Sequence, residues 1–421
     1  MISRFRSEYI SILRKNRKFR LSDLADKLHF SISELSKMLS GRREISNELF
    51  LKMLQAMDIK WNDIDPSEFE STFWMFFDEY YFLNKERCHK IIKEIWSEKE
   101  KWIYSPCFFL YSLTITMYSV FLVPDFLTWN ERQQALSLLS NSLSLFSKDL
   151  QLIILDLVDY DKWRNSEFSA YEILKSRPAI MSAQAANKRV DAVITCHQLL
   201  YQLLAHQNYG LEKIVDTLRL QFASDRNLHR LVCIDYQYGM MLTNLQEFVK
   251  AKEVPMYILP LVAHKEEELV YELLIRNALS VMNWKEAAQW CKYIKYTQYF
   301  SKIQYSVFAP FILYQVGDLT TADEMIRILL SRQRSKKEKQ IILVQKHLLT
   351  GCIKTCLNKL KPLLNQSIRN REVTLLLMLL IIKEKCFEQL NWTHELIQTL
   401  REEKELLWYG FTDASTDCFS I

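Results

Sequence analysis

The side chains best suited to chemistry are the basic residues near the start of the chain. The first 60 residues hold 13 Lys and Arg against 7 Asp and Glu, a net charge of +6, while the whole chain of 421 residues carries +5. The remainder of the chain therefore sums to about −1. Lys and Arg donate hydrogen bonds to phosphate groups and neutralise their charge. The charge distribution predicts that the N-terminal segment contacts nucleic acid.

Two short helices are expected to carry these groups. Small and apolar residues recur at i, i+3, i+4 and i+7, which defines one face of a first helix: Leu21, Leu24, Ala25 and Leu28. A second such face follows: Ile32, Leu35 and Leu39. Ser31 and Glu34 have the spacing of a capping box, so the second helix is expected to begin near Ile32. When two short helices are joined by so few residues, the second helix projects from the surface and can enter the major groove of DNA.

The segment resembles the helix-turn-helix domains of the phage-repressor and Cro class over roughly residues 4 to 61. The small Ala25, the capping Ser31, the apolar Leu35 and the exit Ser40–Gly41–Arg42–Arg43 are the matching features. One position departs from the family, because His29 stands in the turn where glycine is usual. That position generally needs a positive φ, which histidine tolerates better than most residues do, at some cost.

The resemblance implies roles for individual residues. The side chains expected to face base edges are Ile32, Ser33, Ser36 and Lys37, with Ser33 and Lys37 as the hydrogen-bonding readers. The side chains expected to contact phosphates are Arg42, Arg43 and Asn47. The alternative interpretation is that Arg42 and Arg43 only solvate a loop and Lys37 a helix face.

Length and composition predict an all-α chain with a second, larger domain. A chain of 421 residues is too long for one small DNA-binding module. Six glycines and eight prolines are few for this length, whereas sheet-rich folds use more glycine in their turns. We therefore expect a helix-turn-helix domain followed by a large helical body.

Enzyme chemistry, metals and membranes are not favoured. The motifs GxGxxG, GxxxxGK[ST], HExxH and GxSxG do not occur, and the eight histidines are dispersed. We therefore predict no catalytic residue and no cofactor. The nine cysteines form no CxxC pair and follow no signal peptide, so reduced thiols in the cytoplasm are expected, and Cys352 and Cys356 are expected to fill a core rather than bind a metal. The uncharged run Cys107–Val123 is expected to be a buried helix and not a membrane span.

A repeated unit occupies the C-terminal half. Four segments align at offsets of 35, 34 and 34 residues: Asn283–Ala287, Asp318–Ala322, Cys352–Cys356 and Cys386–Leu390. Two looser copies lie near Asn208–Glu212 and Asn244–Phe248. A period near 34 resembles tetratricopeptide repeats, which implies helical hairpins stacked into a right-handed solenoid with a concave binding groove. The basic run Arg332–Lys339 is expected to be a solvated turn, with nucleic-acid contact as the alternative.

The polar stretch Asn62–Ser67 contains Pro66 and predicts a domain boundary with a brief hinge. We assign residues 1–65 to the DNA-binding domain and residues 66–421 to a helical-repeat domain for regulation and dimerisation.

The order of these two domains resembles the bacterial peptide-pheromone receptors, which include the Rgg, NprR, PlcR and PrgX regulators and the arbitrium receptors of phages. The resemblance implies a cytoplasmic homodimer that binds a double-stranded DNA operator with two half-sites. It also implies that the repeat domain binds a short signalling peptide, which changes the spacing of the two DNA-binding domains.

An extended peptide is held through its backbone, for which asparagine amides supply a donor and an acceptor, and arginine can bind a peptide carboxylate. The candidate peptide-binding residues are Asn187, Arg189, Asn227, Arg230, Asn244, Arg276 and Asn277. Each of them can instead make an ordinary hydrogen bond at a surface or between helices. The alternative function is a DNA-tethered scaffold whose repeats bind a partner protein and no peptide.

Overall fold

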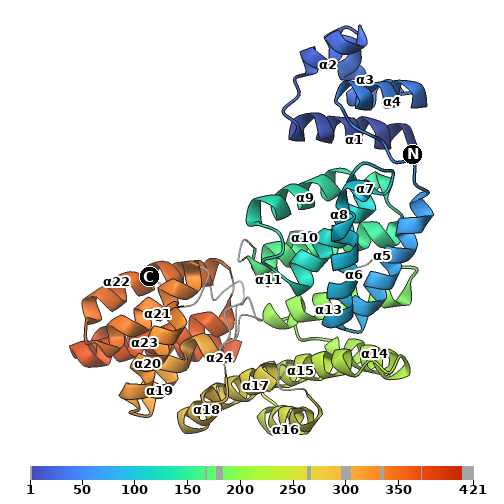
Figure 1. Cartoon of the computed structure of the whole chain (residues 1–421). Coiled ribbons are helices and arrows are strands. Elements are labelled where there is room, and N and C mark those ends of the chain that lie inside the picture. The colour runs from blue at the N-terminus through green and yellow to red at the C-terminus, as the bar shows by residue number, and fades with distance from the viewer. Residues whose placement is uncertain are drawn as a thin grey trace. The chain divides into compact units, whose positions relative to one another are not determined.

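A computed structural model describes residues 2–165, 168–176, 184–262, 267–294, 305–331, 336–370 and 372–409 (Figure 1). Every regular element in these ranges is a helix, so the predicted all-α fold class is confirmed. The chain divides into two compact units. The N-terminal unit comprises Met1–Val158 and Gln184–Asp191, and the C-terminal unit comprises Asp159–Ala183 and Ala192–Ile421.

The N-terminal unit begins with the four helices of the predicted DNA-binding segment and continues with further helices. Its helices are α1 (Ile2–Asn16), α2 (Leu21–Leu28), α3 (Ile32–Leu39), α4 (Asn47–Ala56), α5 (Pro66–Tyr81), α6 (Lys85–Ser97), α7 (Lys99–Ile103), α8 (Phe108–Met117), the π-helix η1 (Tyr118–Leu122), α9 (Trp129–Asn141) and the 3₁₀ turn η2 (Leu143–Leu145). Helices α10 (Lys148–Arg164) and α13 (Lys188–Leu204) each run from one unit into the other.

The uncharged run Cys107–Val123 forms α8 and η1, and nearly all of its side chains are buried. Three hydroxyls in this run bond back to backbone carbonyls one turn earlier, which satisfies them inside the core: Ser112, Thr114 and Thr116. Among the described helices, none combines the length and the apolar character that crossing a membrane requires.

The connection after α4 is packed at its start, where the sequence predicted a brief hinge. The ring of Trp61 lies 5.3 Å from the ring of Tyr9 and 5.0 Å from that of Phe50, measured between centroids. The backbone N–H of Asn62 donates to the carbonyl of Tyr104 at 2.8 Å. A rotation at this segment would have to break these contacts. The domain boundary at residue 65 stays a prediction.

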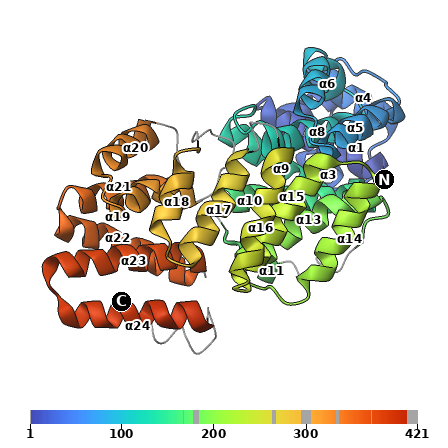
Figure 2. The ribbon, with the colours of Figure 1, turned by 90° about the horizontal axis from the view of Figure 1, so that it is seen from below.

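The C-terminal unit is a series of antiparallel helix pairs. Its helices are α11 (Ala170–Ser176), the main part of α13, α14 (Leu211–Ser224), α15 (Leu228–Asn244), α16 (Phe248–Ile258), η3 (Leu259–Leu261), α17 (Glu267–Ser280), α18 (Trp284–Cys291), η4 (Tyr305–Phe308), α19 (Ala309–Gln315), α20 (Leu319–Ser331), α21 (Lys336–Leu349), α22 (Ile353–Arg369), α23 (Val373–Leu390) and α24 (Thr393–Tyr409). Neighbouring helices pack in chain order, as the hairpin of α23 and α24 shows in Figure 2. Helix pairs that contact their neighbours in this way form a helical solenoid.

The second helix of most pairs begins with the same local pattern. Asn283 caps α18 by accepting a hydrogen bond from the N–H of Glu286, and Asp318 does the same for Thr321 at the start of α20. In four of these helices, the fourth residue after the N-cap position is small and 0 % exposed, which lets two helices approach closely: Ala251, Ala287, Ala322 and Cys356. The predicted copies that begin at Asn283, Asp318 and Cys352 are therefore in register, while the looser copies at Asn208 and Asn244 lie two to three residues early.

The fourth predicted copy, Cys386–Leu390, is wrong. Cys386 lies inside α23 with 0 % exposure, and the next helix starts only at Thr393. The reason is that α23 extends to Leu390 and ends at Asn391, whose φ of 58° reverses the chain. A fixed offset of 34 residues therefore falls in the middle of a helix. Of the basic run Arg332–Lys339, residues 332–335 lie outside the described residues. Residues 336–339 begin α21, and Lys337 is buried and pairs with Glu372, so the predicted solvated turn is wrong for this part of the run.

Candidate nucleic-acid interface

The helix predicted to read DNA has one buried face and one open face. Leu35 and Met38 on α3 are 0 % and 2 % exposed, and they pack with Leu24 and Ala25 of α2. Ser31 caps α3, because its Oγ accepts a hydrogen bond from the N–H of Glu34 at 3.1 Å. The predicted start at Ile32 is therefore confirmed.

All seven residues assigned to DNA contact are exposed: Ile32, Ser33, Ser36, Lys37, Arg42, Arg43 and Asn47. Two predictions were made for Ile32: that it belongs to the apolar face of the helix, and that it contacts base edges. Its side chain is 54 % exposed, so it does not belong to the buried face. A branched apolar side chain at the start of such a helix suits contact with the methyl group of thymine.

The turn between α2 and α3 has the backbone conformation that the sequence predicted. His29 has φ 56° and ψ 39°, in the left-handed region, and the N–H of Phe30 returns to the carbonyl of Ala25 at 3.0 Å. A side chain in this region is strained, which is why glycine is usual there.

Replacing His29 by glycine is expected to raise the free energy of unfolding by about 0.5–1 kcal/mol, because the left-handed strain is removed and the extra flexibility of the unfolded chain offsets only part of it. Urea unfolding of the full chain measures this change. Alanine at the same position serves as the control and is expected to bring no gain, since it keeps a Cβ. A glycine variant that unfolds more easily than the wild type would show that the imidazole has a stabilising role.

The chain leaves α3 through a tight turn that presents two arginines. Gly41 adopts φ 75°, and the N–H groups of Arg42 and Arg43 both return to the carbonyl of Lys37, at 2.9 Å and 3.2 Å. The guanidinium of Arg43 also pairs with the carboxylate of Glu34 at 3.2 Å. Hydrogen bonds from Ser31 and the charge of Arg43 lower the pKa of Glu34 below its usual value. Glu34 therefore stays ionised and competes with phosphate for Arg43.

Asn47 occupies the first turn of α4, where Ser46 is the cap. Its Oδ1 accepts a hydrogen bond from Nη2 of Arg6 at 3.1 Å, and Nη1 of Arg6 donates to the carbonyl of Ile45 at 2.9 Å. Guanidinium groups only donate, so this contact orients the amide with its NH₂ group directed away from Arg6. A donor at a helix N-terminus suits a phosphate oxygen. No pattern in the sequence pointed to Arg6, which lies 41 residues from Asn47 along the chain.

Comparison with known proteins bears on this segment. Residues 10–64 match the helix-turn-helix family HTH_3. The segment is a helix-turn-helix domain, and its presence indicates a sequence-specific DNA-binding regulator. A search of curated proteins found no match to the chain.

The helix-turn-helix domain rests on α7 and α8 through an aromatic cluster formed by Phe5, Tyr9, Phe50, Trp61, Phe108 and Phe109. Tyr9 lies at its centre, 0 % exposed, with its ring 5.1 Å from that of Phe108. The hydroxyl of Tyr9 donates to the carbonyl of Ile103 at 2.6 Å, and burial raises the pKa of this phenol well above its usual value. Arg17 adds a second contact, to the carbonyl of Met57 at 2.8 Å and the hydroxyl of Tyr104 at 3.2 Å.

The residues assigned to peptide binding fall into two groups. Asn187 and Arg189 belong to the N-terminal unit, and both have partners there. The Oδ1 of Asn187 accepts from the N–H of Arg189, and the Arg189 guanidinium pairs with Asp78 at 2.6 Å, above the rings of Tyr81 and Phe82. The sequence alone gave no sign of this pairing, because Asp78 lies 111 residues away.

The other five belong to the first helices of two pairs in the C-terminal unit. Asn227 caps α15 through the N–H of Arg230, and both side chains are buried. Asn244 bridges two helix pairs, since its Nδ2 donates to the carbonyl of Leu203 at 2.9 Å and its Oδ1 accepts from Arg276 at 2.7 Å.

Asn277 donates to the carbonyl of Phe248 at 3.1 Å, while its buried Oδ1 has no hydrogen-bond partner among the described residues. On α15, the buried Oε1 of Gln237 likewise has no hydrogen-bond partner among the described residues. Gln237 was not among the predicted peptide-binding residues. Close by this group, burial and the charge of Arg276 lower the pKa of His206 to about 3, so its ring is neutral near pH 7.

Proposed function

We propose that this chain is a transcription regulator whose helix-turn-helix domain binds an operator and whose helical repeats bind a short signalling peptide. The proposal assigns residues 1–65 to DNA binding and residues 66–421 to regulation and dimerisation. It further takes the protein to be a cytoplasmic homodimer, since two recognition helices about one duplex turn apart, or a multiple of it, are what a site with two half-sites requires.

The observation that carries DNA binding is the open face of α3 with the turn and helix start that follow it: four of the seven assigned residues are exposed on α3, and the other three are exposed after it, in a domain of matching family. Base contact is assigned to Ile32, Ser33, Ser36 and Lys37, and phosphate contact to Arg42, Arg43 and Asn47. The orientation of the Asn47 amide by Arg6 supports the phosphate assignment.

Peptide binding is supported by the two buried acceptors on neighbouring first helices, Oε1 of Gln237 on α15 and Oδ1 of Asn277 on α17. A buried polar atom without a partner costs free energy, which a ligand can recover by donating to it. Extended peptides carry N–H groups along their length, so such a ligand fits two acceptors on adjacent helices. Asn244 and Arg276 lie in the same part of the unit and would bind a carboxylate or a further amide.

A binding peptide is expected to raise the thermal midpoint of the full chain, because a ligand that binds only the folded state stabilises it, by roughly 2.7 kcal/mol at 100 times its dissociation constant. The probes are short synthetic peptides corresponding to small open reading frames beside the gene. Operator affinity is measured with and without each peptide.

The double variant Gln237→Leu/Asn277→Leu is expected to lose the response, while the exposed control Gln289→Leu keeps it. If no neighbouring peptide shifts the midpoint although operator binding is intact, the repeats act instead as a scaffold for a partner protein. If the wild-type protein does not bind an operator, the proposed DNA binding is wrong, whatever the result with peptides.

A further inference from the structure

The strongest concentration of positive charge outside the helix-turn-helix domain lies in the C-terminal unit. Residues 332–371 contain 11 Lys and Arg and one Asp or Glu, a net of +10, so the rest of the chain sums to −5. Helix α22 alone carries four basic residues and no acidic one. Such a local excess, in a chain whose remainder is acidic, sets up a strong positive potential on one side of this helix.

The basic and amide side chains of α22 form one line on its exposed side, which we call the basic stripe: Lys354, Asn358, Lys361, Asn365 and Arg369. Their spacing of four, three, four and four residues keeps them on one helical face, and they extend over about 22 Å of helix. The opposite face of α22 is buried through Cys356, Leu360 and Leu363. The stripe is therefore directed to solvent along its whole length.

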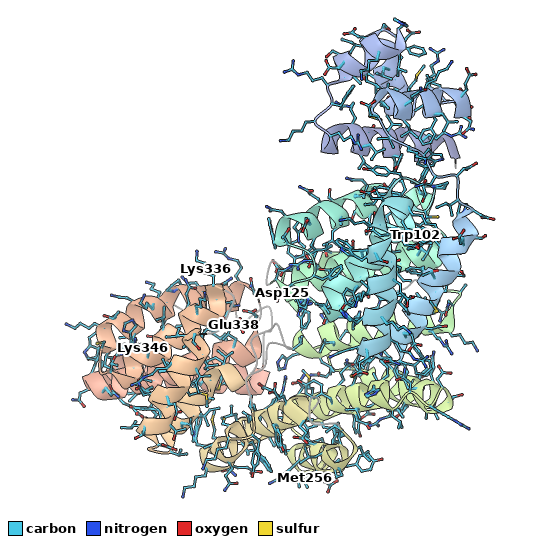
Figure 3. All side chains as sticks on the ribbon, in the orientation of Figure 1. Trp102, Asp125, Met256, Lys336, Glu338 and Lys346 are labelled. Carbon is cyan, nitrogen blue, oxygen red and sulfur yellow. The ribbon has the colours of Figure 1, made fainter. Side chains whose placement is uncertain are left out.

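Two further lysines lie near His347 of α21, outside the stripe. Partial burial, and after it the charges of Lys359 and Lys346, lower the pKa of His347 below its usual value. Lys346 lies on α21 and is exposed, as is Lys336 at the start of that helix (Figure 3). The positive surface therefore continues from α22 onto α21.

The basic groups of this surface form no ion pairs within the part of the chain that the structure describes. Among the described residues, no ion pair involves Lys346, Lys354, Lys359, Lys361 or Arg369. Lysines elsewhere on the C-terminal unit do find carboxylates, such as Lys252 with Glu286 at 2.6 Å. The side chains of the stripe offer only donors and Asn carbonyls, without a carboxylate that would repel an anion.

We propose that the basic stripe of α22, together with Lys346 and Lys359 near His347 of α21, binds the phosphate backbone of duplex DNA. Lys, Arg and Asn are the side chains that contact phosphates without reading sequence. DNA is the favoured polyanion because the same chain carries a helix-turn-helix domain, so that duplex DNA is a polyanion this chain already has the means to bind. The inference rests on the chain's binding to DNA but not on a peptide ligand.

A protein partner fits this surface less well. Protein interfaces are anchored by aromatic and large apolar side chains at their centres. Within residues 336–369, no large hydrophobic side chain is exposed, whereas exposed ones occur before and after, at Leu319 and Trp392. A lipid surface is bound more strongly when apolar groups insert beside the basic ones, and this surface exposes none. The charged and amide donors alone match a phosphate backbone.

The test compares two variants of the full chain in which four exposed lysines become glutamine. One carries Lys346→Gln, Lys354→Gln, Lys359→Gln and Lys361→Gln, and the matched control carries Lys90→Gln, Lys93→Gln, Lys213→Gln and Lys285→Gln. Binding to a labelled duplex of random sequence is followed by fluorescence anisotropy between about 50 and 200 mM salt. The stripe variant is expected to bind at least about 10-fold more weakly and to show a log–log salt slope less steep by about 3.6, since roughly 0.9 is lost for each of four phosphate contacts. The control is expected to keep the slope of the wild type.

Further arms separate this proposal from operator binding. If Arg42→Ala/Arg43→Ala weakens DNA binding while the stripe variant matches the wild type in affinity and slope, the basic stripe proposal is wrong and the operator interface stands. If single-stranded RNA, polyglutamate or phosphatidylserine vesicles depend on the stripe and the duplex does not, the surface serves another partner and the proposal is equally overturned. Additive losses from the two sets of substitutions support two separate contacts to DNA.

Discussion

Replacing Tyr9 by alanine is expected to lower the free energy of unfolding of the N-terminal unit by about 3–5 kcal/mol, the range for removing a fully buried aromatic ring. Tyr9 contacts rings on three elements outside α1, namely Phe50 of α4, Trp61 of the connection and Phe108 of α8. Its loss therefore leaves a cavity between the helix-turn-helix domain and the helices that support it. Thermal or urea unfolding, followed through tryptophan fluorescence, measures the change.

The control Tyr9→Phe keeps the ring and removes only the hydrogen bond to the carbonyl of Ile103, so it is expected to cost about 1–3 kcal/mol. The two variants also differ from the wild type in their response to alkali. The folded pKa of Tyr9 is raised by burial, so above pH 10 the phenol ionises only in the unfolded chain. Stability of the wild type therefore falls as pH rises through this region, and part of that fall is expected to disappear in Tyr9→Phe. Equal pH dependence in both proteins would contradict the buried position of the hydroxyl.

The packing around Tyr9 changes how a signal can reach the DNA-binding surface. The sequence predicted a brief hinge over Asn62–Ser67, and Trp61 and Asn62 at its start are held by contacts to the helices on both sides. A ligand can shift an equilibrium only through a difference in its affinity for two arrangements. In this protein the helix-turn-helix domain is expected to move together with α7 and α8, so any rearrangement has to occur elsewhere in the chain.

Local patterns in the sequence predicted local structure well. The cap at Ser31, the left-handed turn at His29 and the helix starts after Asn283 and Asp318 each depend on residues within a few positions, and the structure confirms them. The failed repeat copy at Cys386 has the opposite cause, since the length of α23 is set by packing against α22 and α24 and not by a fixed period.

Contacts between distant residues were beyond what periodicity predicts. Arg6 reaches Asn47, Tyr9 reaches Ile103, and Arg189 reaches Asp78, across 41, 94 and 111 residues. An amphipathic pattern says which face of a helix is buried but not which partner covers it. For the same reason, the assignment of Asn187 and Arg189 to a ligand came from residue type alone, whereas the structure gives both residues partners within the N-terminal unit.

Replacing both Arg42 and Arg43 by alanine is expected to weaken binding to every DNA sequence by roughly 10- to 100-fold and to reduce the log–log salt slope by about 1.8, the contribution of two phosphate contacts. The two arginines follow α3 in a turn fixed by hydrogen bonds to the carbonyl of Lys37, so the loss is electrostatic and leaves the fold of the domain intact. Salt titrations with an operator fragment and with an unrelated duplex measure both quantities. Lys37→Ala is the comparison, and it is expected to reduce the preference for the operator more than the affinity for unrelated DNA.

The pairing of Arg43 with Glu34 refines this expectation. Because Glu34 partly neutralises Arg43 in the free protein, Arg42→Ala is expected to cost more affinity than Arg43→Ala. Glu34→Gln removes a negative charge from the DNA-facing side and releases Arg43, so tighter binding to unrelated duplexes is expected from that variant. Its side chain keeps the length needed near the Ser31 cap, and an unchanged thermal midpoint would verify that α3 is intact. If Arg42→Ala, Arg43→Ala and Glu34→Gln all keep the salt slope of the wild type, this turn does not contact phosphates. The reason is that a change in the number of phosphate contacts changes the number of counterions released.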